Sequence, residues 1–309
     1  MRRAAAVFRA ALYCFLLPGV IVLALFVLGA ETRAGEPVHK KGSLLIGIEP
    51  EHNIFDQVRR YRSLAEYLSD QLGMEVKLTI MSRYGEVLKR FRSLHLDGAV
   101  LSAYTATMAI DELGLIPLAN QVDKDGDATS TGYIFVRKDS GIRSVADMRG
   151  RSIVFVDPAT AEGYLFARAF FRRNNIENLD GFFSRHYFSG SHASAIFAVL
   201  DGRADIGVAK NTVFNRLASR DRSIRHELLI LAKSPPVPEV TICLQKNLPP
   251  QTLEKIRETL LAMTQSVEGR RVLKELGARR FVAAGPEAFS GVREMAREAG
   301  VQGAENNGR

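Results

Sequence analysis

The segment 154–164 carries the clearest candidate for ligand chemistry in the sequence. A short apolar stretch ends at Val156, Asp157 opens a turn, and a helix is expected to begin near Thr160. The N–H groups of a first helical turn have no intrahelical acceptors and lie at the positive end of the helix dipole, so they can hold an oxyanion. The Thr160 hydroxyl would add a donor. The alternative is that Thr160 only caps the helix, as Thr commonly does.

Two more turns place donors at expected strand-to-helix junctions. Ser189 and Ser191 lie between a strand and a helix, and His192 stands on the first turn of that helix, where it can donate to an anion. Ser102 and Tyr104 follow another expected strand, at the edge where open α/β sheets bind ligands. The alternatives are a capping turn with an exposed His192, and a Tyr104 packed on the surface.

Three other polar residues adjoin these turns. His52 lies in the first expected strand-to-helix loop, where it would line the crevice, and Asn211 follows an expected strand at 206–208. Glu162, beside the Thr160 turn, would repel a bound anion if it pointed inward, so we expect it to point outward. Donor-rich turns at several strand ends together predict a crevice that binds a small anion.

The first elements along the chain lead to the turn that holds Ser102 and Tyr104. They follow the order β-α-β-α-β, which predicts a parallel sheet with helices on both faces. Apolar runs predict strands at 44–48, 76–80 and 99–101, and helical spacing predicts helices at 54–72 and 84–94.

A second set of alternating elements follows. Its strands are expected at 132–137, 152–156, near 187–188, and at 206–208, 228–232 and 239–244; its helices are expected at 144–148, 162–173 and 192–200. Three prolines between Ser234 and Pro238 exclude a central strand there and predict a stiff crossing segment. From Pro249 onward the pattern is helical, with Gly277 as a stop.

The two sets of elements share a similar pattern in one segment each. Segments 87–100 and 196–208 both read as a helix, a short turn, an Asp and a buried strand. This match indicates two lobes of like topology.

The composition excludes several classes of protein. Of 309 residues, 46% are hydrophobic and 25% charged, which is ordinary for a globular chain. The net charge is +8, but Lys and Arg are scattered without interleaved aromatic residues, so we expect no nucleic acid partner. The sequence contains no Gly-x-Ser-x-Gly, His-Glu-x-x-His, Cys pair or Walker loop, so we expect no enzyme, no catalytic residues, no metal and no cofactor.

The N-terminus has the chemistry of an export signal. Three arginines within the first nine residues precede an uncharged, largely apolar stretch at 10–30. Residues 1–34 are therefore either a cleaved signal peptide or a retained membrane anchor, because the stretch approaches spanning length. Cys14 has no lipoprotein context, and without this segment Cys243 is the only thiol, expected to be an inert core residue.

From Ser43 to Met295 the sequence resembles the phosphate/phosphite/phosphonate substrate-binding proteins of ABC transporters. The resemblance rests on Gly47-Ile48-Glu49-Pro50, Leu64-Ala65-Glu66-Tyr67-Leu68, Asp157-Pro158 with Gly163-Tyr164-Leu165-Phe166, Phe188-Ser189-Gly190-Ser191-His192, and Val199-Leu200-Asp201-Gly202-Arg203-Ala204-Asp205.

This resemblance implies a type II periplasmic-binding fold: an α/β protein of two Rossmann-like lobes with mixed, mainly parallel sheets, joined by a two-stranded hinge. Lobe 1 would comprise 43–131 and 239–300, and lobe 2 would comprise 132–238, with crossings near Gly132 and from Pro235 to Glu239. The implied function is periplasmic capture of a small phosphonate-like oxyanion and its delivery to an ABC permease. The alternative is a membrane-anchored ligand sensor with a signalling partner.

The resemblance also marks site residues. Tyr104 matches the crevice tyrosine of the family, Thr160 the middle of its oxyanion turn, and His192 its binding histidine. This chain has Ala159 and Ala161 where relatives carry hydroxyls, and Lys210 and Asn211 where an acidic residue often follows the strand. Loss of that acid argues against an aminoalkylphosphonate as the ligand.

Overall fold

The structure is a computed structural model that describes residues 42–50 and 54–301. All described residues belong to one compact unit that starts at Gly42. The predictions for residues 1–34 and for His52 lie outside the described residues. Within the described part of the chain, no helix has both the length and the apolar composition needed to cross a bilayer.

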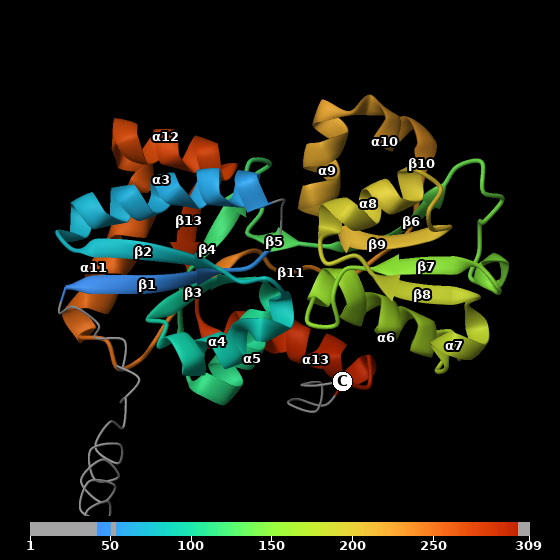
Figure 1. The fold of residues 1–309 in the computed structure, drawn as a ribbon, viewed down its shortest axis with the longest axis horizontal. Coiled ribbons are helices and arrows are strands. Elements are labelled where there is room, and N and C mark those ends of the chain that lie inside the picture. Colours follow the sequence, from blue (N-terminus) through green and yellow to red (C-terminus); the bar gives the residue numbers. More distant parts are fainter. Residues whose placement is uncertain (1–41, 51–53, 302–309) are drawn as a thin grey trace, which may run out of the picture. The chain divides into compact units, whose positions relative to one another are not determined.

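One part of the unit, here called the first lobe, is built on a six-stranded mixed sheet (Figure 1). The strand order is β13-β4-β12-β3-β1-β2, in which β2, β1 and β3 are parallel and the other three pair antiparallel. The strands are β1 (Ser43–Ile48), β2 (Glu75–Ile80), β3 (Gly98–Leu101), β4 (Ile116–Asp123), β12 (Thr241–Leu244) and β13 (Ala278–Ala283).

The second lobe is built on a five-stranded mixed sheet of order β10-β6-β9-β7-β8. Strands β8, β7 and β9 are parallel, whereas β6 and β10 pair antiparallel. The strands are β6 (Gly132–Arg137), β7 (Ser152–Phe155), β8 (Arg185–Phe188), β9 (Ile206–Lys210) and β10 (Leu228–Lys233). The strand order β2-β1-β3-β12 of the first lobe thus corresponds to β8-β7-β9-β6 in the second. The similar segments 87–100 and 196–208 end on the equivalent strands β3 and β9.

Helices cover both faces of each sheet (Figure 1). In the first lobe, one face carries α3 (Ile54–Leu72), α11 (Pro250–Leu261) and α12 (Val267–Leu276), and the other carries α4 (Val87–Leu94) and α5 (Ala103–Leu113). In the second lobe, one face carries α8 (His192–Leu200), α9 (Asn211–Arg220) and α10 (Arg222–Glu227), and the other carries α6 (Phe166–Arg173) and α7 (Leu179–Phe182).

The two lobes are linked by a short pair of strands and by the last helix. β5 (Thr129–Ser130) and β11 (Val237–Pro238) pair antiparallel, with Val237 opposite Ser130. The three-proline segment therefore stays out of both main sheets, as predicted, because proline lacks a ladder donor. α13 (Ser290–Glu298) contacts α5 in the first lobe and α6 in the second.

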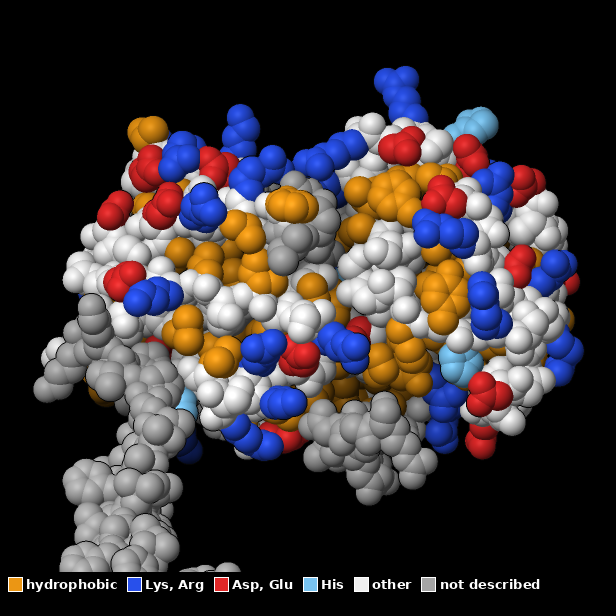
Figure 2. Space-filling model, in the orientation of Figure 1, with side chains coloured by type: hydrophobic (Ala, Val, Ile, Leu, Met, Phe, Trp, Pro, Cys, Tyr) orange, Lys and Arg blue, Asp and Glu red, His pale blue; other side chains and the backbone are white. Residues whose placement is uncertain are grey.

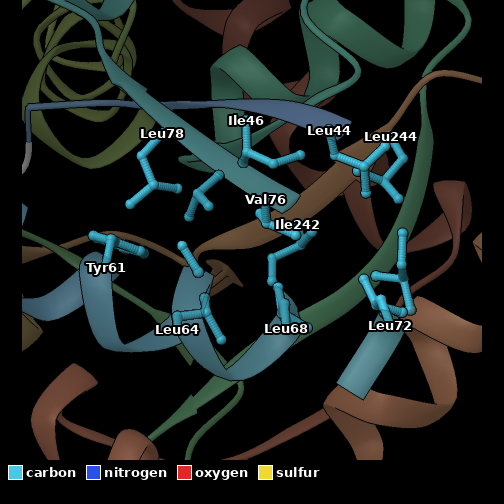
Figure 3. A pocket seen from close by; sticks show the side chains of 13 residues that line it. Leu44, Ile46, Tyr61, Leu64, Leu68, Leu72, Val76, Leu78, Ile242 and Leu244 are labelled. Atoms are coloured by element: carbon cyan, nitrogen blue, oxygen red, sulfur yellow. The ribbon is translucent and has the colours of Figure 1, made fainter. Parts of the chain in front are cut away.

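Helix α3 shows how the apolar spacing builds the core. Leu64, Leu68 and Leu72 recur every fourth residue and point toward strand side chains such as Ile46 and Val76 (Figure 3). The helix stops at Gly73, whose φ of +70° favours glycine. An apolar cavity of about 20 Å³ remains between the helix and the sheet.

The helical pattern from Pro249 is confirmed up to the predicted stop at Gly277, but the strand β13 that follows was not predicted. This strand is at the edge of the sheet, pairs with β4, and buries Ala278 and Phe281 while Arg279 and Arg280 are exposed. Its sequence therefore lacks the apolar run of a central strand, and only the pairing with β4 identifies it. No strand was predicted for β4 and no helix for α9 or α10.

Candidate functional site

The carboxyl end of the first sheet carries a buried carboxylate. Glu49 follows β1, and its Oε2 accepts a hydrogen bond of 2.7 Å from the backbone N–H of Ser102, which follows β3. The Ser102 hydroxyl lies 3.1 Å from the Thr105 hydroxyl, so the Ser102 side chain is satisfied within its own turn. Ser102 therefore lies at the predicted strand edge, with its N–H directed to Glu49.

The Thr160 turn adopts an unusual form. Thr160 occupies the N-cap position of a π-helical turn, η3 (Ala161–Leu165), that leads into α6, but its side chain does not cap the helix. Instead its hydroxyl donates to the carbonyl of Asp157 at 2.6 Å, and Asp157 Oδ1 accepts from the N–H of Ala159 at 2.8 Å. Because the single hydroxyl proton is used inside the turn, donors for an anion here are the backbone N–H groups of the first helical turn.

His192 is buried at the start of α8, which contradicts the alternative of an exposed capping residue. Its Nδ1 accepts a hydrogen bond of 3.0 Å from the backbone N–H of Lys210. An Nδ1 that accepts carries no proton, so a neutral His192 has its proton on Nε2 and can donate there.

The two serines near His192 stabilise the turn. Ser191 caps α8 by accepting from the N–H of Ser194 at 3.1 Å, and the Ser189 hydroxyl donates to the carbonyl of Phe155 at 3.0 Å. Asn211 acts similarly at the start of α9, where its Oδ1 accepts from the N–H of Thr131 at 2.8 Å. These bonds fix the backbone around His192 and the crossing segment.

Tyr84 meets His192 from the opposite lobe. It starts the short 3-10 turn η1 (Tyr84–Glu86), after β2, and its buried ring lies edge-on to the imidazole with 6.1 Å between ring centroids. In the same turn, a Cβ built on Gly85 would lie 3.8 Å from Ala159 Cβ. Tyr84 was not predicted, although its place after a parallel strand is the signal that would have found it.

A cluster of buried charges lies beside the Thr160 turn. Lys210 Nζ lies 2.5 Å from Glu239 Oε1 and 3.7 Å from Glu162 Oε1, and the Ser130 hydroxyl donates to Glu162 Oε1 at 2.5 Å. The prediction that Glu162 points outward is wrong, since its side chain is 0% exposed. The opposite charge of Lys210 and the Ser130 donor offset the cost of burying this carboxylate.

Tyr104 lies away from this cluster. It faces an open cavity of about 880 Å³ between α5, α6 and α13, where Arg172 and Arg293 also contribute. Burial, and secondarily the negative charge of Glu112, raise the pKa of the Tyr104 phenol. Its predicted role in ligand binding therefore stays a prediction.

The core cysteine has the environment that the sequence predicted. Cys243 is free and fully buried, and burial, together with the charge of Glu49, raises the pKa of its thiol far above the ordinary range. The thiol therefore stays protonated. Across residues 42–50 and 54–301, no three His, Cys, Asp or Glu side chains gather as a metal site would require.

The surface charges show no gathered basic stripe on the face in Figure 2. Lys and Arg side chains there are interspersed with Asp and Glu over the coloured residues. This pattern agrees with the scattering of basic residues along the chain.

Comparison with known proteins relates this architecture to a transport family. The family model described as "ABC transporter, phosphonate, periplasmic substrate-binding protein" matches residues 46–289. The phosphonates-binding periplasmic protein of Escherichia coli is 25% identical over 268 residues, which cover 85% of this chain and 78% of that protein.

Two solved structures share the fold. The binding protein component of an ABC phosphonate transporter from Pseudomonas aeruginosa has a TM-score of 0.76 and 22% identity, covering 86% of this chain and 90% of that one. PhnD1 from Prochlorococcus marinus in complex with methylphosphonate has a TM-score of 0.76 and 19% identity, covering 85% and 100%. The two-lobed type II periplasmic-binding fold with mixed sheets is thereby confirmed. The chain belongs to the family of periplasmic substrate-binding proteins of ABC phosphonate transporters.

Proposed function

We propose that this protein captures a small phosphorus oxyanion of the phosphonate class between its two lobes and delivers it to an ABC permease. The proposal takes its ligand class from the family and from PhnD1, which was solved with methylphosphonate. It takes its site from the residues that meet at the Thr160 turn and at His192.

The observation that carries the proposal is the fixed tautomer of His192. The N–H of Lys210 occupies Nδ1, so the imidazole presents Nε2–H as a donor from the first turn of α8. The first turn after Thr160 supplies backbone donors at the start of another helix of the same lobe. Tyr84 reaches His192 from the first lobe, so a ligand held here would contact both lobes.

Closure of the lobes about the β5–β11 pair would couple binding to transport. We place the lobe boundaries at 43–131 with 239–300 for one lobe and at 132–238 for the other. A ligand that touches both lobes stabilises the closed form because the open form lacks half of its contacts. The closed form would then present both lobes to the permease.

The proposed role includes export to the periplasm and no chemical conversion of the ligand. Residues 1–34 would direct export, either as a cleaved signal or as an anchor. Family membership favours the transport role over the anchored sensor. The buried, protonated Cys243 has neither the access nor the ionisation that a nucleophile needs.

A thermal-shift screen of the chain from Gly35 onward tests this proposal. The panel is methylphosphonate, phosphite, phosphate, aminoethylphosphonate, sulfate and several carboxylates. A ligand at 100 times its Kd adds about 2.7 kcal/mol to the free energy of unfolding, which gives a clear rise in Tm. We expect such a rise with at least one phosphorus oxyanion, and no response to any of them would contradict the proposal.

A further inference from the structure

Glu162 places a carboxylate where an oxyanion would bind. It lies two residues after Thr160, in the first turn of η3, and its side chain is 0% exposed. Its Oε1 accepts from the Ser130 hydroxyl and lies 3.7 Å from Lys210 Nζ. Its Oε2 is also buried, and no donor among the described residues hydrogen-bonds to it.

Glu162 shares its countercharge with a second buried carboxylate. The Lys210 ammonium lies 2.5 Å from Glu239 and 3.7 Å from Glu162. Asp157 lies in the preceding turn with the positive charge of Arg83 near it, and His192 adds no charge in the tautomer whose Nδ1 accepts from the N–H of Lys210. Beside the Glu162 carboxylate, a dianionic ligand would therefore be repelled more strongly than a monoanionic one, because the site is poorly solvated.

A carboxylate accepts hydrogen bonds and cannot donate one, so a ligand next to Glu162 must bring the proton. Sulfate has no proton at neutral pH. A phosphonate monoanion has one P–OH group, and its single negative charge also reduces the repulsion. The Glu162 oxygen that lacks a donor and the countercharge that Glu162 shares with Glu239 thus point to the same kind of ligand.

We propose that Glu162 determines specificity by accepting a hydrogen bond from the P–OH of a singly protonated phosphorus oxyacid, and that it rejects fully ionised anions such as sulfate. This inference rests on the proposed function and names the protonation state of its ligand. In the bound state the anionic oxygens would face the first-turn N–H groups and His192 Nε2, and the P–OH would face Glu162 Oε2.

The test is calorimetric titration of the full chain with methylphosphonate and with sulfate, from below to above the second ionisation of methylphosphonate. We expect the wild-type protein to bind methylphosphonate at least about tenfold more tightly than sulfate. Its affinity for methylphosphonate should fall as the pH rises through that ionisation. Glu162→Gln should bind sulfate more tightly and lose most of this pH dependence, because the amide can donate to an unprotonated oxygen.

Glu177→Gln is the matched control. Glu177 is an exposed carboxylate of the same lobe, so the substitution removes the same charge away from the turn. It should leave the anion preference and the pH profile unchanged. Should Glu162→Gln fail to fold, the wild-type pH profile and its discrimination against sulfate still decide the question.

The outcomes separate the inference from the proposed function. Binding of methylphosphonate and sulfate with equal affinity and no pH dependence would overturn the inference and leave the proposed function intact. A strong preference for aminoethylphosphonate over methylphosphonate that Glu162→Gln abolishes would also overturn it, because Glu162 would then pair with an ammonium group. Failure of the wild-type protein to bind any phosphorus oxyanion would overturn both.

Discussion

His192 and Lys210 constrain one another through a single backbone hydrogen bond. The N–H of Lys210 fixes the His192 tautomer, while the Lys210 ammonium lies between Glu239 and Glu162. The end of one strand thereby supplies both the orientation of a neutral donor and the countercharge for two buried carboxylates.

His192→Asn tests the fixed tautomer. The Asn side-chain oxygen can still accept from the N–H of Lys210, but the Asn NH2 group is too short to reach the position of Nε2–H. Losing a hydrogen bond to a charged ligand should weaken affinity for methylphosphonate by about 10- to 100-fold, with the Tm of the free protein nearly unchanged. Calorimetric titration measures the affinity. Unchanged affinity in both His192→Asn and His192→Ala would remove His192 from the site.

Lys210→Met tests the buried charge cluster. Removing the cation leaves Glu162 and Glu239 buried without their countercharge, which should lower the free energy of unfolding by about 3–5 kcal/mol at pH 7. Urea denaturation measures the loss. The triple variant that adds Glu162→Gln and Glu239→Gln should recover most of it, and a triple variant no more stable than Lys210→Met would show that the cost has another origin.

Asp157→Asn tests the cost of ionisation in the Thr160 turn. Burial raises the pKa of Asp157 above its ordinary value of 3.8, against the opposing effects of the Ala159 N–H and Arg83. The folded state therefore binds the Asp157 proton more tightly than the unfolded chain does. At a pH above the pKa of the folded state, ionisation of Asp157 lowers the free energy of unfolding, and at a pH below the pKa of the unfolded state this cost is absent. Asn can still accept from Ala159, so the variant should be more stable than wild type at pH 7.

The difference between Asp157→Asn and wild type should shrink as the pH falls through the raised pKa of the folded state, and it should be nearly lost below about 4. Thermal unfolding of both proteins from pH 3 to 7 measures it. A variant that is less stable than wild type at pH 7 would show that the ionised carboxylate stabilises the turn.

At the scale of the elements, α3 and the first sheet are predictable from spacing, but their packing is not perfect. The side chains in Figure 3 surround an apolar cavity of about 20 Å³, lined by Val76 on β2 and Leu64 on α3. The side chains that line a cavity too small for a ligand lose dispersion contacts on that side, and the cavity has room for one added methyl group.

Val76→Ile should fill part of this cavity. The added methylene keeps the β-branched shape that suits a strand and should raise the free energy of unfolding by up to about 1 kcal/mol. Urea denaturation is the measurement. Val122→Ile is the control: Val122 is buried in β4 of the same sheet and does not line the cavity, so its extra methylene should be neutral or destabilising. Equal effects of the two variants would contradict the cavity explanation.

At the scale of the whole molecule, the lobes touch where the proposed ligand binds. Tyr84 meets His192, and Gly85 meets Ala159, across the two lobes. The β5–β11 pair and α13 provide the other links. Release of a ligand from this site therefore requires the η1 turn to separate from the Thr160 turn.

Gly85→Cys combined with Ala159→Cys should lock this contact. A Cβ at position 85 would lie 3.8 Å from Cβ of residue 159, which is close to the mean separation in disulfides. In the chain from Gly35 onward, the buried Cys243 should not compete. The oxidised double variant should neither take up nor release methylphosphonate on the timescale of a titration, and reduction should restore exchange. Exchange that is equally fast in the oxidised form would show that the lobes need not separate there.

Much of this fold could be predicted from local patterns. The spacing of apolar residues predicted α3 and α8 with the bounds that the structure shows, and the similarity of segments 87–100 and 196–208 predicted two like lobes. The turns after β7 and β8 were predicted as donor-rich junctions because small and hydroxyl residues follow apolar runs there. Local patterns failed for β13, whose stability comes from pairing with β4 rather than from its own composition.

By itself, therefore, the sequence determined the order of the elements, the turns that adjoin the site and the membership of a transport family. Only the tertiary structure decided which way Glu162 points, that Lys210 lies between two carboxylates, and that Tyr84 rather than Tyr104 meets His192. The physical reason is that periodicity and turn chemistry depend on near neighbours in the chain, whereas burial of a charge depends on a partner brought from another segment. A buried carboxylate and an exposed one look the same in sequence until that partner is placed.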